Sequence, residues 1–247
     1  MTRRMFLSLS AVVISAAAFA GFQSAKTTEP ADPLIAGFSK RTVASVADAV
    51  DQVCGRRGFL SHRIRPMVPG KVVGRATTSL VRPAEKEQAT PAAATKHSVE
   101  MIENAKPGDV GVIVMADGLD VAAIGGLMGT AAKSRGMAGM ILDGGVRDVE
   151  ELRDLGLPTY AASVTPATAV GRYASVARDV PVDCGGVTVN PGDIIVAGED
   201  GVVAVPKEQA EAVLKRATEI DDLETKMVPF IKQFKSLSKA IAQFNRI

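Results

Sequence analysis

The stretch VGVIVMADGLDVAAIGGLMGTAAKSRGMAGMILDGGVRDVEELRDL, residues 110–155, decides the predicted fold of this chain. Its residues 110–115 and 139–142 are almost wholly apolar, which predicts two β-strands buried on both faces. A helix is predicted after each strand, one opening at the glycine pair 125–126 and one at residues 147–148. This strand–helix–strand–helix order predicts a right-handed parallel crossover and therefore an α/β fold.

Further elements are predicted on both sides of this stretch. Before it we expect, in chain order, a helix at residues 42–53, a strand at 71–80, a loop at 83–95 and a short helix from Ser98 to Ala105. After it, short strands are predicted at residues 158–163, 180–189, 193–197 and 201–205, and the turn sequences at 190–193 and 198–201 predict hairpins between the last three. A long amphipathic helix from residue 207 and a last helix at 237–244 complete one domain, residues 42–247.

The amino terminus has the pattern of an export signal. Arg3 and Arg4 precede an uncharged apolar run that ends in small residues at 18–20, as in a twin-arginine signal peptide. We therefore expect a signal peptide at residues 1–25, a linker at 26–41, and an exported, periplasmic protein without a stable membrane span. An uncleaved membrane anchor is the alternative, because the apolar run approaches spanning length.

The composition excludes several classes of function. The 247 residues carry 29 Lys and Arg against 27 Asp and Glu, and a net charge of +2 argues against nucleic-acid binding by bulk electrostatics. Two His exclude a three-His zinc site, and two Cys exclude a Cys-rich zinc site. Whether Cys54 and Cys184 pair is left open.

The two predicted helix beginnings form the candidate site. Both follow the carboxyl ends of parallel strands, where open α/β sheets bind ligands. Gly125 and Gly126 let the backbone N–H groups approach an anion, Arg147 can clamp that anion, and Asp148 offers a hard oxygen to a divalent cation. The alternative is that Asp148 only caps its helix beside a solvated Arg147. A dinucleotide fingerprint is absent, because Ile124 stands where glycine is needed.

This region resembles the RraA-like family, which contains the regulator of ribonuclease E activity A and the 4-hydroxy-4-methyl-2-oxoglutarate aldolases. The residues that carry the resemblance are Gly125, Gly126, Leu127, Met128, Ala131, Ala132, Lys133, Arg135, Gly136, Ala138, Gly139, Asp143, Gly144, Val146, Arg147 and Asp148. Segments 45–49, 64–66, 69–70, 73–76, 184–189, 191–193 and 200–203 are similar to the family as well. The resemblance implies a single swivelling β/β/α-type domain that assembles as a homotrimer or hexamer with sites between subunits.

The resemblance also implies a chemistry. The aldolases hold a pyruvoyl unit with a divalent Mg or Mn ion, and Asp148 would be the metal ligand. Arg147 would stabilise the pyruvate enolate, and Gly126, Leu127 and Met128 would bind the substrate at the helix start. The implied substrate is a 2-oxo acid such as 4-hydroxy-4-methyl-2-oxoglutarate, and the same chemistry would decarboxylate oxaloacetate.

The chain departs from the family at one position. The aldolases carry an acidic residue where this chain has Gly126, so a carboxylate that would hold metal-bound water is missing. The family also takes a glutamate from the carboxyl-terminal helix of a neighbouring subunit, for which Glu219 or Glu224 could serve, although a solvated helix face is the more common place for either one. A non-catalytic RraA-like regulator and a small-carboxylate-binding protein are therefore the alternatives to a lyase.

Overall fold

A computed structural model describes residues 32–245 of the chain. The predicted signal peptide at residues 1–25 and the first part of the predicted linker lie outside these described residues. The described helices are α1 (Pro33–Phe38), α2 (Val43–Cys54), α3 (Pro91–Asn104), α4 (Gly126–Ser134), α5 (Val149–Asp154), α6 (Ala210–Phe234) and α7 (Leu237–Phe244), with a short 3-10 turn at Lys207–Gln209. The strands are β1 (Arg65–Val68), β2 (Val72–Pro83), β3 (Val110–Met115), β4 (Ala122–Ile124), β5 (Gly139–Val146), β6 (Thr159–Val164), β7 (Tyr173–Arg178), β8 (Val182–Cys184), β9 (Val187–Val189), β10 (Ile194–Gly198) and β11 (Gly201–Val205).

Parallel strands form the centre of the fold, as the sequence predicts. The order along the main sheet is β1-β6-β5-β3-β2-β10-β11, with β4 added to β5 and β7 added to β2. Strands β2, β3, β5 and β6 are parallel neighbours, and α4 and α5 lie in the connections that follow β3 and β5. The β10–β11 pair is the hairpin predicted at residues 193–205. Residues 180–189, predicted as one strand, instead fold back at Gly185 and Gly186 to form the β8–β9 hairpin. The predicted mixed α/β fold with carboxyl-terminal helices is therefore confirmed.

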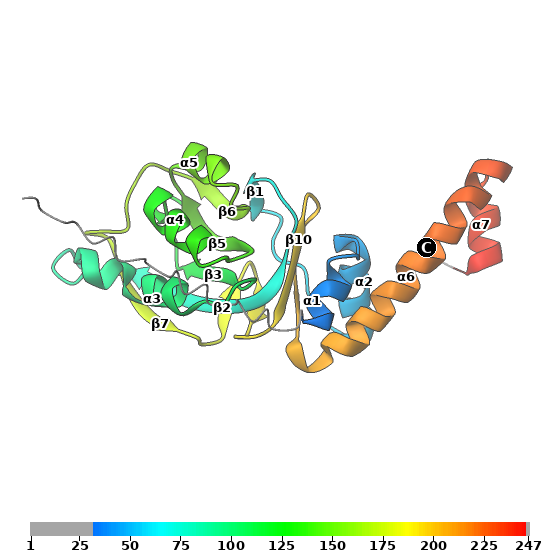
Figure 1. The fold of residues 1–247 in the computed structure, drawn as a ribbon, viewed down its shortest axis with the longest axis horizontal. Coiled ribbons are helices and arrows are strands. Elements are labelled where there is room, and N and C mark those ends of the chain that lie inside the picture. Colours follow the sequence, from blue (N-terminus) through cyan, green and yellow to red (C-terminus); the bar gives the residue numbers. More distant parts are fainter. Residues whose placement is uncertain (1–31, 246–247) are drawn as a thin grey trace, which may run out of the picture. The chain divides into compact units, whose positions relative to one another are not determined.

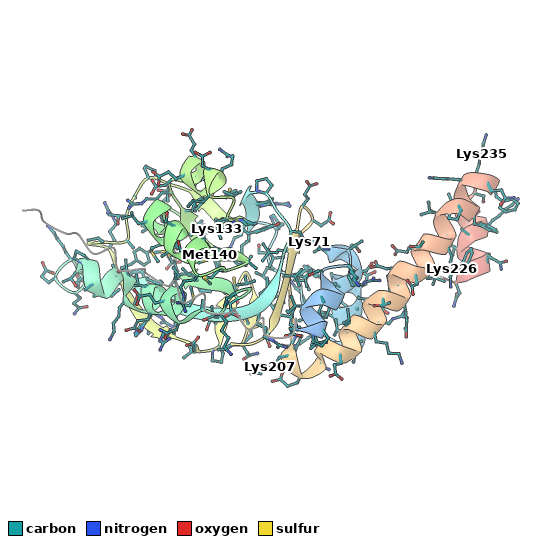
Figure 2. All side chains as sticks on the ribbon, viewed as in Figure 1. Lys71, Lys133, Met140, Lys207, Lys226 and Lys235 are labelled. Carbon is teal, nitrogen blue, oxygen red and sulfur yellow. The ribbon has the colours of Figure 1, made fainter. Side chains whose placement is uncertain are left out.

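Alternating side chains divide the interior into three clusters. Ile113 and Met140 belong to the cluster that α3, α4 and α5 cover, and Figure 2 labels Met140 there. Val112 and Ile195 belong to the second cluster, which includes the residues of the β8–β9 hairpin. Val196, on the other face of β10, belongs to the third cluster with α1, α2 and α6, which lie beyond β10 in Figure 1. Period-two alternation of side chains thus lets β10 serve two cores at once.

Four other local predictions were wrong. Helix α1 lies within the predicted linker, and its Phe38 is fully buried, so the folded part begins earlier than expected. Helix α3 begins at Pro91 instead of Ser98, because the Thr90 side chain caps it and proline suits the first helical turn. Strand β5 continues through the predicted turn at residues 143–145, where it pairs with both β4 and β6. Strand β4, in a predicted loop, and strand β7 were not predicted.

The remaining predictions concern the membrane and the cysteines. Among the helices of residues 32–245, none is long and apolar enough to cross a membrane. Cys54 and Cys184 are both free thiols. Cys184 belongs to the second cluster and Cys54 packs against the third, and burial raises the pKa of the Cys184 thiol well above its usual value.

Candidate active site

The connection from β5 to α5 turns sharply at Asp148. Asp148 adopts the left-handed backbone conformation, with φ 54° and ψ 42°, which costs energy for a residue other than glycine. Aspartate tolerates this conformation better than most residues do. The turn occurs immediately before the first residue of α5, so it fixes the direction of the Asp148 carboxylate.

The carboxylate of Asp148 points to the start of α4, not to the start of its own helix. Its Oδ2 accepts a hydrogen bond of 2.9 Å from the backbone N–H of Gly126, and it makes no capping hydrogen bond to α5. A side chain on Gly125 would collide with this oxygen, so the approach depends on glycine there. The Asp148 side chain is 38% exposed, which leaves oxygen surface for a ligand. The alternative in which Asp148 only caps its own helix does not describe this arrangement.

The Arg147 side chain lies against Gly125, beside the Asp148 carboxylate. Its Nε is 3.5 Å from Oδ2 of Asp148, and a Cβ on Gly125 would lie 2.8 Å from that Nε. Its backbone N–H donates to the carbonyl oxygen of Ile124, which ties the residue to β4. The side chain is 41% exposed, so its guanidinium can reach both Asp148 and a bound anion.

The first turn of α4 presents free backbone donors. Gly125 is the N-cap residue and has no side chain, so α4 has no side-chain cap of its own. The N–H groups of Leu127 and Met128 follow that of Gly126 in this turn, where a helix supplies no internal acceptor. The Leu127 side chain is 90% exposed, whereas Met128 packs against the first cluster. The start of α4 can therefore bind a carboxylate through the backbone.

One residue at this site was not predicted. The carboxylate of Glu151, on the first turn of α5, occupies the space where a side chain on Gly126 would begin. A Cβ on Gly126 would overlap Oε2 of Glu151 and lie 2.8 Å from its Cδ. No local signal in the sequence indicates this placement, because Asp148 lies outside α5 in a left-handed conformation and helical spacing does not relate it to Glu151.

A cavity of about 510 Å³ lies elsewhere, lined by residues that include Arg63, Arg82, Asp117, Asp143 and Asp183. Neither Arg147 nor Asp148 lines it. Asp143 is 6% exposed, and its two oxygens accept hydrogen bonds from Arg63 at 2.5 Å and from the backbone N–H of Gly185 at 2.7 Å. Asp143 is thus occupied by protein donors, whereas Asp117 and Asp183 line the same cavity without such donors to their carboxylates among the described residues. The cavity contains neither the Arg147–Asp148 pair nor the glycine-opened helix start.

Glu219 does not lie at this site within one chain. It is on α6, where its carboxylate pairs with Arg216 at 3.0 Å, and Arg216 also binds Gln52. In residues 32–245, no three or more His, Cys, Asp or Glu side chains gather as a metal site. The chain's own donors are carboxylate oxygens of Asp148 and its neighbours. Such a set suits Mg, which is commonly held by one or two carboxylates together with water and substrate oxygens.

The family model described as "RraA-like: Aldolase/RraA" matches residues 43–204, which is well over half of the chain. The chain belongs to the RraA-like family. The match runs from the start of α2 into β11 and so includes both helix starts that form the candidate site.

Curated relatives share this family. A protein of Halalkalibacterium halodurans named "Putative 4-hydroxy-4-methyl-2-oxoglutarate aldolase" is 33% identical over 179 residues, which cover 70% of this chain and 76% of that protein. Protein DlpA of Legionella pneumophila is 29% identical over 198 residues, which cover 80% of this chain. The chain matches only 31% of the length of DlpA.

Solved structures share the fold. A crystal structure of an uncharacterized protein from Pseudomonas syringae pv. tomato matches with a TM-score of 0.77 and 27% identity, over 87% of this chain and 96% of the other. RraAS2 of Streptomyces coelicolor, described as an unusual member of the RNase ES inhibitor RraA protein family, matches with a TM-score of 0.69 and 28% identity, over 79% of this chain and 96% of that chain. A structure described as belonging to an inhibitor family therefore shares this fold, while the relative named a putative aldolase is similar to the chain in sequence.

Proposed function

We propose that this RraA-like protein is a divalent-metal-dependent lyase of the class II pyruvate aldolase or oxaloacetate decarboxylase type. Its substrate would be a 2-oxo acid such as 4-hydroxy-4-methyl-2-oxoglutarate. One observation carries the proposal: the Asp148 carboxylate lies against the glycine-opened start of α4, with Arg147 beside it. A cation ligand, a guanidinium and a helix start are then available to one small anionic substrate.

The backbone of α4 would bind and orient the substrate. The N–H groups of Leu127 and Met128 are directed toward the site by the helix and would donate to the substrate carboxylate, which the positive end of the helix dipole also favours. The glycines at positions 125 and 126 add no side chains of their own here, which leaves room for the Arg147, Asp148 and Glu151 side chains at the helix start. The keto group of a 2-oxo acid, adjacent to that carboxylate, would then lie near Arg147.

Arg147 would stabilise negative charge on the substrate. As the carbon–carbon bond breaks, electron density moves onto the keto oxygen of the pyruvoyl unit, and a guanidinium held at that oxygen lowers the energy of the transition state. Asp148 would hold Mg or Mn, and that ion, when bound, supplies Lewis-acid polarisation and charge neutralisation. The left-handed turn at Asp148 fixes the carboxylate before the substrate arrives, which reduces the cost of ordering the site.

Pyruvate release tests the proposal. The purified protein should release pyruvate from oxaloacetate or from 4-hydroxy-4-methyl-2-oxoglutarate in the presence of Mg or Mn, and a chelator should abolish the release. Full activity after metal removal, or no turnover of either substrate with either metal, would contradict the lyase.

A small-carboxylate-binding protein is the second candidate, and the absence of a side chain at Gly126 favours it. Without the acidic residue of the aldolases at that position, the site could bind a 2-oxo acid without cleaving it. Calorimetric binding of pyruvate or oxalate without turnover would support this candidate. Inhibition of a ribonuclease without binding of either acid would instead support an RraA-like regulator.

The proposal includes assembly and location. The 90% exposed Leu127 at the start of α4 is an apolar side chain that a neighbouring subunit could cover, and Glu219 could reach the site from such a neighbour. We expect a homotrimer or hexamer, which light scattering on the purified chain measures. We also expect export through residues 1–25, which fractionation of cells that express the full-length chain measures.

A further inference from the structure

The carboxylate of Glu151 has no partner among residues 32–245. The structure gives it neither an ion pair nor a hydrogen bond in that range, although it lies against the start of α4 next to Asp148. Exposed glutamates on helices usually extend into solvent, whereas this one folds over Gly126. Two carboxylates brought to one helix start repel each other. Arg147 pairs with Asp148 at 3.5 Å but forms no ion pair with Glu151 among the described residues, so a cation held by both acids would offset the repulsion.

The glycine at position 126 is what admits Glu151. A Cβ at this position would overlap the Oε2 atom and lie 2.8 Å from Cδ, so any other residue would displace the carboxylate. The backbone at Gly126 is helical without a positive φ, so the conformation itself does not require glycine. The space above position 126 is therefore used by a side chain that comes from α5.

We infer that Glu151 is the second carboxylate donor of the proposed cation site, next to Asp148, directly or through a bound water. The inference rests on the proposed function, because the cation is the one that Asp148 would hold. Glycine at position 126 then leaves the space that the Glu151 carboxylate, from the neighbouring helix α5, occupies. The carboxylate that the aldolases carry at the position of Gly126 is thus supplied by Glu151 of the same chain.

The two carboxylates have different tasks. Asp148 is fixed by its left-handed turn and by the hydrogen bond from Gly126, so its orientation is set without a ligand. Glu151 has a longer side chain and no such restraint, so it can adjust to the coordination distance that the ion requires. One or two carboxylates with water are the usual protein donors to Mg.

A titration of the full-length protein with Mn²⁺ tests the inference. The electron paramagnetic resonance signal of free Mn²⁺ reports how much of the ion remains unbound. Glu151→Gln should weaken Mn²⁺ binding about 10-fold to 100-fold, as the loss of a supporting carboxylate does at other metal sites. Glu150→Gln removes the same charge from the same turn of α5 and serves as the matched control, with an affinity within about twofold of wild type, because a general loss of charge acts weakly at surface exposure.

Two variants at position 126 show whether Glu151 binds the ion or only adds negative charge near it. Gly126→Ala should also weaken Mn²⁺ binding, because the new Cβ displaces the carboxylate of Glu151 while the charge remains on the chain. The double variant Gly126→Asp with Glu151→Gln should recover binding, because it returns a carboxylate to the same space from α4. Melting temperatures of all variants show whether each one folds, and Gly126→Ala supplies the readout if Glu151→Gln does not.

The possible results distinguish this inference from the proposed function. If Glu151→Gln and Gly126→Ala bind Mn²⁺ like wild type while Asp148→Asn does not, the inference is wrong and the lyase proposal stands. If Asp148→Asn also binds like wild type, or wild type binds no Mn²⁺, both are wrong.

Discussion

Asp143 and Asp148 are five residues apart in one segment, yet their surroundings differ completely. Asp143 is 6% exposed in β5, and both of its oxygens accept hydrogen bonds from the protein, at Arg63 and Gly185. Asp148 follows β5 in a left-handed turn, with a 38% exposed side chain. Both oxygens of Asp143 thus bind donors of the protein, while Asp148 keeps exposed oxygen surface for a ligand.

This difference shows that a carboxylate within a strand and one just past the strand end take different roles. Within the strand, neighbouring elements cover the side chain, and a buried charge must find donors in the protein. Past the strand end, neighbours cover less of the side chain, and the Asp148 carboxylate lies against the start of another helix, α4. The cavity beside Asp143 is consequently less informative about catalysis than the exposed pair Arg147 and Asp148.

The largest expected effect is the loss of turnover when Asp148 is substituted. Asp148→Ala should reduce pyruvate release about 10³-fold, because a bound cation supplies several kcal/mol of transition-state stabilisation and each 1.4 kcal/mol is tenfold in rate. Steady-state assays with Mg and with Mn measure this. Asp154→Ala, at the other end of α5, is the control and should retain activity. Comparable rates for Asp148→Ala and wild type would remove Asp148 from the mechanism.

The next effect is on stability at Asp143. Asp143→Ala leaves the buried N–H of Gly185 without an acceptor, which should cost about 2 kcal/mol of unfolding free energy. For a chain of this size, that corresponds to a melting temperature lower by about 4 to 8 °C. Calorimetry measures it, with the exposed Asp183→Ala as control. An unchanged melting temperature would mean that Asp143 is not a structural acid.

A smaller effect is expected at Arg63, the other partner of Asp143. Its side chain is 50% exposed, so water screens the ion pair and can replace the lost donor. Arg63→Gln should therefore reduce the free energy of unfolding by about 1 kcal/mol or less. A chemical denaturation midpoint measures it. A loss as large as that of Asp143→Ala would show that the ion pair, and not the Gly185 hydrogen bond, stabilises this region.

Sequence reasoning located both helix starts, because buried parallel strands and the glycine pair give strong local signals. It missed β4 and the end of β5, since Asp143, Gly144 and Gly145 have the composition of a turn and form a strand only through pairing with two neighbours. It missed the start of α3 because a run rich in proline and alanine has no amphipathic period. Glu151 could not be placed from the sequence, because its position depends on how α5 packs against α4.

The most direct test compares melting temperatures with and without Mn²⁺ in wild type, Asp148→Asn and Asp143→Asn. Asparagine tolerates the left-handed conformation and can still accept from Gly126, so Asp148→Asn should melt like wild type without metal. A ligand that binds only the folded state raises the melting temperature, so Mn²⁺ should stabilise wild type and Asp143→Asn but not Asp148→Asn. An equal Mn²⁺-dependent rise in wild type and Asp148→Asn would contradict the assignment of these two acids.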